Sequence, residues 1–82
     1  MAKPKKKATA QVKSGDNYLL IKLSGQQSYV RIIDENGDMV RHDESPGITE
    51  LLQGVAAGKK YRIETDGEIT ECTSQRIDIE TE

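Results

Sequence analysis

The chain has 82 residues, which is enough for one domain and too few for two hydrophobic cores. Apolar residues make up 34% and charged residues 32%, and Ile and Val are common while Phe and Trp are absent, so the composition favours strands and a small core over helices. One cysteine excludes an internal disulfide, and no apolar run is long enough to span a membrane.

The net charge of −2 is unevenly distributed along the chain. Four lysines lie within the first seven residues, so the rest of the chain carries eight basic against fourteen acidic residues, a net charge of about −6. We expect residues 1–7 to be a flexible, disordered basic arm and residues 8–82 to form a single domain. No apolar stretch of a secretory signal follows the lysines, so we expect cytoplasmic synthesis without export.

The first half of the domain alternates polar turn clusters with short apolar segments. Residues 8–13 form a weak edge-strand pattern, and the segment that follows the first turn places Leu19, Ile21 and Leu23 on one face. This alternation predicts a core strand at 18–23.

The next two segments predict a β-hairpin. Residues 29–33 alternate as a strand, and residues 39–42 return as its partner after Asn36-Gly37. Asn-Gly is the strongest short hairpin signal, since both residues tolerate a positive φ.

Residues 48–53 allow two interpretations. Ile48, Leu51 and Leu52 have helical i, i+3, i+4 spacing, but the segment between two flanking glycines is very short for a helix. A strand is the favoured interpretation, and one helical turn is the alternative.

The end of the chain predicts three more strands. Residues 60–66 alternate, Asp66-Gly67 predicts a second hairpin returning through 68–72, and residues 76–81 alternate strictly. Seven or eight short strands at this spacing indicate an all-β sandwich or barrel.

The stretch between two of these strands resembles a motif of fibronectin type III and related immunoglobulin-like domains. Those domains carry leucine-x-glycine-leucine-x-proline-glycine-x-x-tyrosine where one strand crosses to the next, and here Ala57 replaces the proline. The matching residues are Leu52, Gly54, Val55, Gly58 and Tyr61.

The resemblance implies a small immunoglobulin-like β-sandwich in which the Tyr61 hydroxyl bonds back to nearby backbone. Gly58 permits a tight turn there. The family's early-strand tryptophan is missing, which favours a variant sandwich with a smaller core. Such domains mostly bind proteins or glycans or act as spacers, so the resemblance implies a non-catalytic role. In size, basic arm and acidic body, the chain resembles phage capsid-decoration and other virion accessory proteins.

The basic arm is the main candidate binding site. A flexible cationic segment suits an acidic protein groove better than nucleic acid, because the acidic body repels a duplex. A solubilising tail is the alternative. The lysines concerned are Lys3, Lys5, Lys6 and Lys7.

Other chemistry is weakly indicated. The acidic run 34–38 superficially suggests calcium, but Ser45 stands where a bidentate Glu is needed, so a plain turn is favoured. One Cys and one His cannot supply a usual zinc site. A nucleophilic site would need His42 with Cys72 or Ser45, and Asp43 as its orienting group, and inert surface roles are favoured. We expect no enzyme, metal or cofactor.

Two further features are candidates for contact surfaces. Tyr18 and Tyr29 suit either an interface or cross-strand packing, and packing is favoured. The terminal segment 77–80 could form an edge that pairs with another chain, although its acidic residues oppose this.

These observations favour a non-catalytic module that docks on a larger protein assembly, most concretely a phage capsid. The alternative is a small regulatory or inhibitor protein that presents its acidic face to a host nucleic-acid-binding protein. A third hypothesis is weak, salt-sensitive binding of nucleic acid through the arm. The partner, the binding face, the oligomeric state and whether the chain is part of a longer protein stay open.

Overall fold

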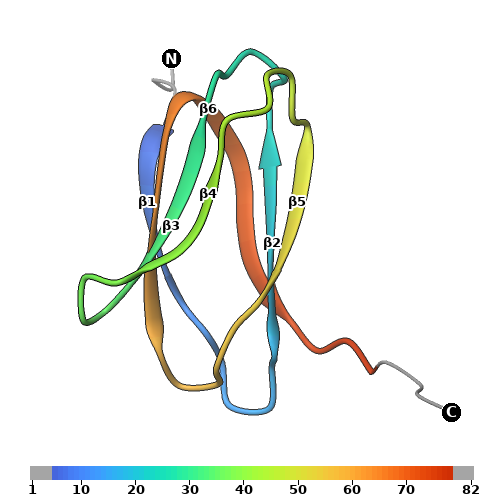
Figure 1. Cartoon of the computed structure of the whole chain (residues 1–82). Coiled ribbons are helices and arrows are strands. Elements are labelled where there is room, and N and C mark those ends of the chain that lie inside the picture. Colours follow the sequence, from blue (N-terminus) through green and yellow to red (C-terminus); the bar gives the residue numbers. More distant parts are fainter. Residues whose placement is uncertain (1–4, 79–82) are drawn as a thin grey trace, which may run out of the picture.

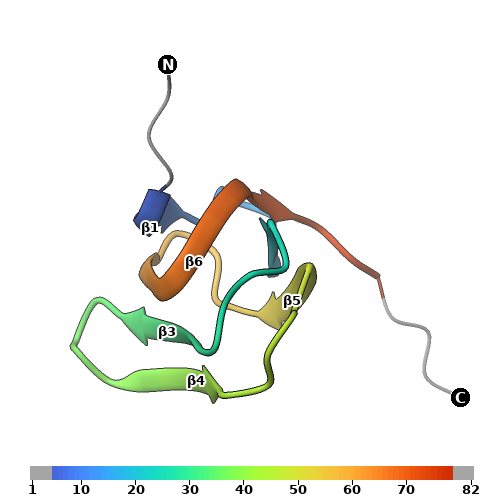
Figure 2. The same ribbon diagram turned by 90° about the horizontal axis from the view of Figure 1, so that it is seen from above.

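One long, bent strand organises the fold. The computed structural model describes residues 5–78 and, within them, the side chains of 7–78. Strand β6 (Lys60–Gln75) rises beside the first strand, passes over the top of the molecule and descends on the other side (Figures 1 and 2). The five strands that precede it are β1 (Lys5–Gln11), β2 (Tyr18–Leu23), β3 (Val30–Asp34), β4 (Met39–Asp43) and β5 (Glu50–Gly54).

The strands form one curled antiparallel sheet in the order β4-β3-β6-β2-β5, with β1 as an additional partner of β6. Residues 60–65 of β6 pair with β1 and β3, whereas 69–75 pair with β2, and Ile69 also lies opposite Lys5 of β1. Within the described range there is no helix long and apolar enough to cross a membrane.

The expected all-β class is confirmed, but the described residues form six strands and not seven or eight. Residues 60–66 and 68–72 were expected to be two strands of a hairpin and are one continuous strand. Residues 76–78 are not in a strand, and the remainder of the last predicted strand lies outside the described residues.

The second predicted hairpin is wrong because Gly67 serves close packing and not a turn. Its φ is not positive, and a Cβ added there would lie 2.5 Å from the Gln27 Cβ and 3.2 Å from the Gln26 carbonyl oxygen. Thr65 helps to hold the bend, because its hydroxyl donates to the Tyr29 carbonyl at 2.7 Å and accepts from the Gly67 N–H at 3.1 Å. The bend of β6 is thus packed tightly against the loop that joins β2 to β3.

The first predicted hairpin is confirmed as β3 and β4. Gly37 takes a φ of +87° and Asn36 does not take a positive φ, so only the glycine uses the left-handed region. The Asp34 carboxylate accepts the backbone N–H groups of Asn36 and Asp38, each at 2.9 Å. The strand preferred for residues 48–53 is also confirmed, as β5.

The core lies inside the curl, where the inward side chains of the strands meet. Alternate residues of β2 are buried, as expected for Leu19, Ile21 and Leu23. In β6 the odd-numbered positions from 61 to 69 are all buried, so the same face of the strand points inward on both sides of the bend. The largest fully buried side chains are Val12, Leu19, Ile21, Val30, Ile32 and Ile63.

The ordered body begins earlier than expected. We placed residues 1–7 in a disordered arm, but β1 includes residues 5–7, where Lys5 lies opposite Ile69 and Lys7 opposite Glu64. The backbone pairing with β6 orders this segment despite its charge, and a bulge between the two lysines relaxes the register. Residues 1–4 of the expected arm lie outside the described range.

Candidate binding surface

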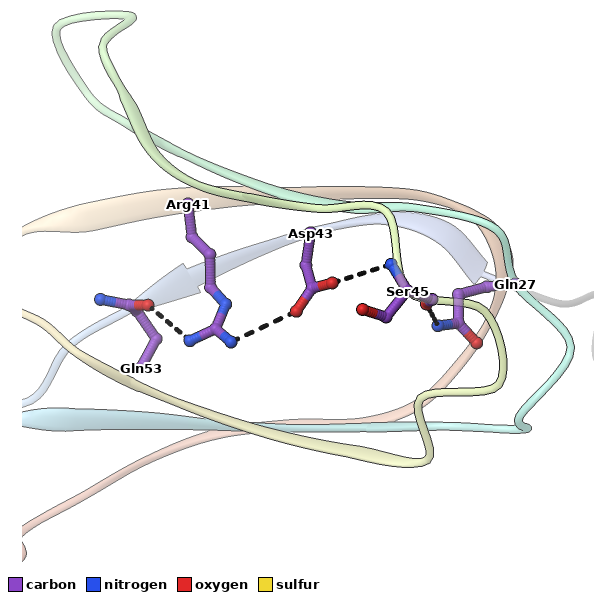
Figure 3. A network of polar contacts seen from close by, with 5 residues as sticks. All are labelled: Gln27, Arg41, Asp43, Ser45 and Gln53. Carbon is purple, nitrogen blue, oxygen red and sulfur yellow. Dashed lines mark hydrogen bonds and ion pairs between the residues drawn. The ribbon is translucent and has the colours of Figure 1, made fainter.

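The open side of the curled sheet lies between β4 and β5, the two strands that end the strand order. A chain of polar side chains bridges these strands (Figure 3). Arg41 on β4 donates to the Gln53 side-chain oxygen on β5 at 3.3 Å and to the Asp43 carboxylate at 3.4 Å. Side chains therefore connect the two edges here.

The Asp43 carboxylate anchors this bridge to the loop after β4. It accepts the Ser45 backbone N–H at 2.8 Å, and the Ser45 carbonyl accepts from the buried Gln27 amide at 3.1 Å. Hydrogen bonds from Ser45, with a smaller contribution from the Arg41 guanidinium, lower the pKa of Asp43 below its ordinary value. Asp43 is consequently a stable anion at neutral pH and acts as a structural acceptor.

The exposed large apolar side chains of the described residues all lie on these two strands. Met39 and Val40 on β4 are 52% and 36% exposed, and Leu52 on β5 is 44% exposed. Exposed apolar side chains on the edge strands of a sheet are typical of a protein-contact surface.

The β3–β4 hairpin extends from the body (Figure 1) and forms one wall of an open surface pocket of about 480 Å³. Glu35 at the hairpin tip ties it to the β5–β6 loop, with a 3.4 Å ion pair to Lys59 and a 3.4 Å hydrogen bond from the Lys60 N–H. The pocket is lined by Thr9, Asp34, Glu35, Asn36, Gly37, Lys60, Tyr61 and Arg62.

The acidic run of this hairpin does not converge on a cation position. Asp34 directs one oxygen at two backbone N–H groups, and Glu35 pairs with Lys59. No group of three or more His, Cys, Asp or Glu side chains within the described part of the chain is arranged to hold a metal ion.

The residues considered for nucleophilic chemistry are not assembled into a relay. His42 Nε2 lies 3.5 Å from Glu44, whereas Asp43 bonds to Arg41 and to the Ser45 backbone. Cys72 lies in the second half of β6, which is not a neighbour of β4 in the sheet. The inert interpretation of these residues therefore stays the favoured one.

Three of the four predicted binding lysines belong to β1, as described above, and Lys3 lies outside the described residues. The Lys7 side chain is exposed. The lysine-rich segment is therefore attached to the body through β1. This attachment determines where its positive charge lies relative to the acidic body.

The predicted structural corner joins β5 to β6. Tyr61 is 7% exposed, and its hydroxyl accepts the Ala56 backbone N–H at 3.1 Å. Gly58 has a φ of +79°, whereas Gly54 has an ordinary φ. Leu52, the first residue of the motif, points outward, and its neighbour Leu51 enters the core instead.

The remaining candidates for contact surfaces, Tyr29, Tyr18 and Ile77, contact other residues of the protein. The ring of Tyr29 lies 4.6 Å below the Arg31 guanidinium, and Tyr18 is half-buried beside Gly54. Ile77 is held by Asn17 through hydrogen bonds of 2.8 and 2.9 Å, and its segment has no strand neighbours within the described range.

Two features were missed from the sequence. The bridge from Gln27 through Arg41 to Gln53 joins residues far apart along the chain, and no local spacing indicates it. Asp66 was assigned to a turn, but its carboxylate accepts from the Ser28 hydroxyl and, at 2.9 Å, from the Ser28 N–H. These bonds lower the pKa of Asp66 below its ordinary value.

Comparison with known proteins gives no relative for this chain: no family model, no curated protein and no solved structure matches it.

Proposed function

We propose that this chain is a non-catalytic binding module that docks on a larger protein assembly, most concretely as a decoration protein of a phage capsid. The observation that carries the proposal is that the large exposed apolar side chains, Met39 and Val40 on β4 and Leu52 on β5, lie on the two strands that Arg41 and Gln53 join. Protein contact uses apolar area with a polar rim, and this surface has both.

Within this proposal, the two parts of the sheet are arranged as in an immunoglobulin-like domain. In that fold strand B pairs with E, and strand C pairs with F and, where present, C′. Here β2 pairs with β5, and β3 lies between β4 and β6, which supports the same placement. β1 takes the position beside F, and the second half of β6 takes the position beside B. The continuous β6 distinguishes this chain from that pattern.

The basic N-terminal segment supports docking on an acidic protein surface. Its four lysines adjoin a body with a net charge of about −6, so the molecule has a positive end and a negative remainder. In the proposal the lysines strengthen docking electrostatically, and the edge strands supply the apolar contact.

A second candidate function rests on the acidic body. Exposed acids on the β3–β4 hairpin and the second half of β6, such as Glu35 and Glu68, favour a regulatory protein that occupies the nucleic-acid groove of a host protein. This alternative predicts capture of a nuclease or polymerase.

The test is capture from a lysate of phage-infected cells by the immobilised chain, followed by identification of the retained protein. Retention of a shell-forming capsid protein supports the proposal, and retention of a nucleic-acid enzyme supports the alternative. A chain with Val40→Glu should lose the capsid protein, because the substitution places a charge in the apolar contact. Equal capture by the parent chain and this variant would contradict the proposed surface.

Substitution of the lysines tests the electrostatic part separately. Because residues 5–7 belong to β1, replacement of Lys3, Lys5, Lys6 and Lys7 by Gln is preferable to deletion. We expect weaker binding at low salt and a smaller decrease of affinity as salt rises, since screening then has less charge to act on. Unchanged affinity at low salt would exclude a role for these lysines.

A further inference from the structure

We propose that β5 is a self-pairing edge through which two copies of the chain associate, with the strands antiparallel and the two-fold axis at Leu52. The strand path ends at β4 and β5, and β1, which pairs with β6 alone, is a third edge, so each of these strands has one side without a strand neighbour in the described structure. Such edges usually carry charges or bulges that prevent pairing with another chain.

β1 and β4 have these protections and β5 does not. β1 has a register break in its pairing with β6 and carries Lys5, Lys6 and Lys7 in succession. β4 has a bulge in its pairing with β3 and carries Arg41, His42 and Asp43 in succession. β5 pairs with β2 in an unbroken register, and Glu50 is its one charged residue. β5 is therefore the better template for strand addition.

The backbone alternation shows which groups of β5 face outward. The Leu23 N–H donates to the Thr49 carbonyl at 2.9 Å, and the Val55 N–H donates to the Asn17 carbonyl at 2.9 Å, in line with the β2–β5 register. Bonded and non-bonded pairs alternate in an antiparallel ladder. The backbone groups of Leu51 and Gln53 consequently face β2, and those of Glu50, Leu52 and Gly54 face the free edge.

A second copy fits this edge with matched partners. With the two-fold axis at Leu52, this residue lies opposite itself, and its outward N–H and carbonyl form the mutual bonded pair that the symmetry requires. Glu50 then lies opposite Gly54 of the second copy, and Leu51 opposite Gln53, so no like charges are opposed. The exposed Leu52 side chains meet across the strands, which removes apolar surface from water. In such a dimer the docking contact of the proposed function rests on Met39 and Val40 of β4, not on Leu52.

The bridge at the open side leaves this edge free. Gln53 is directed toward Arg41, and its amide also donates to the Gly54 carbonyl at 3.1 Å. That carbonyl keeps a second lone pair for the Glu50 N–H of the second copy. The hydrogen bonds of the bridge therefore use none of the outward backbone groups of Glu50 and Leu52.

Sedimentation of the purified chain over a wide concentration range tests the proposal and needs no knowledge of the proposed partner assembly. We expect a monomer–dimer equilibrium. Leu52→Lys should abolish it, because two ammonium groups then face each other, whereas Leu52→Val should retain it. Val40→Lys on β4 is the matched control and should dimerise as the parent does.

A second measurement uses the unmodified chain. On raising the concentration, the amide NMR signals of Glu50, Leu52 and Gly54 should shift, and those of Leu51 and Gln53 should move much less, since β2 already binds them. A concentration-independent monomer, a dimer unaffected by Leu52→Lys, or a dimer lost with Val40→Lys would each overturn the proposal.

Discussion

At the residue scale, Tyr61 combines two roles in the corner between β5 and β6. Its ring is buried in the core, and its hydroxyl reaches back to accept the Ala56 N–H. The hydroxyl thus satisfies a backbone donor of the loop, while the ring anchors the start of β6.

Tyr61→Phe should lower the free energy of unfolding by about 1 kcal/mol, because the ring is kept and one hydrogen bond is lost. Urea denaturation measures the change. Tyr18→Phe is the control, since the Tyr18 hydroxyl makes no hydrogen bond within the described structure, and it should be close to neutral. Equal effects of the two substitutions would remove the argument for the Ala56 bond.

Asp66 should make stability depend on pH. Its folded-state pKa is lowered by bonds from Ser28, so its stabilising contribution is complete above the ordinary value of 3.8 and is lost as the pH falls through the lower, folded-state pKa. Asp66→Asn should therefore lower the Tm near neutral pH, and the difference from the parent should shrink as the pH is lowered below 3.8. Thermal melts across this pH range measure it, and a pH-independent difference would contradict the assignment.

The sequence predicted some of these residue roles because they depend on neighbours along the chain. The Tyr61 hydroxyl bond was expected from the motif, and its acceptor geometry is local, five residues from Ala56. The motif includes Leu52 but does not indicate which leucine of β5 enters the core, and the register with β2 buries Leu51. Gln27 and Gln53 gave no signal, because a glutamine that bridges two strands has the same local pattern as a solvated one.

At the element scale, β6 shows how a strand can turn a corner without reversing. Asp66-Gly67 predicts a hairpin by a local rule, but the required small residue serves a close approach to Gln27. In the structure, positions 61, 63, 65, 67 and 69 are all buried, but Thr65 and Gly67 interrupt the apolar pattern in the sequence, so the continuity of the strand is not evident from it. Each half of β6 pairs with strands that are distant in sequence. The Asp66-Gly67 dipeptide carries no information about these pairings.

Gly67→Ala should cost about 1–3 kcal/mol of unfolding free energy, because the new methyl group overlaps Gln27 atoms and the backbone must move. Gly54→Ala is the matched control. A Cβ there meets the Tyr18 ring at an ordinary 3.7 Å, and the φ is not positive, so a small effect is expected. Chemical denaturation of both variants checks the prediction, and a neutral Gly67→Ala would show that the bend is not tightly packed.

At the scale of the whole molecule, β6 belongs to both parts of the curled sheet. Ile63 in its first half lies opposite Ile32 of β3, and Cys72 in its second half lies opposite Ile21 of β2. Each part therefore shares a strand with the other, and neither has a core of its own.

Ile63→Val and Ile21→Val test this sharing. Each should lower the free energy of unfolding by about 0.5–1.5 kcal/mol and leave one cooperative transition, although the two residues lie in different parts of the sheet. Denaturation curves followed by tyrosine fluorescence and by far-UV circular dichroism should coincide for both variants. Separate transitions would mean that the two parts unfold independently.

The bent strand also governs when the protein can fold during its synthesis. β6 follows the other five strands along the chain, and it supplies the ladder partner of β1, β2 and β3. A ribosome-bound chain that lacks β6 has only the β3–β4 and β2–β5 pairs, and two-stranded pairs are marginal in water. Folding must therefore wait for the exit of β6 from the ribosome, and the contacts of β6 with β1 and β2, distant in sequence, place the protein among the slower folders of its size.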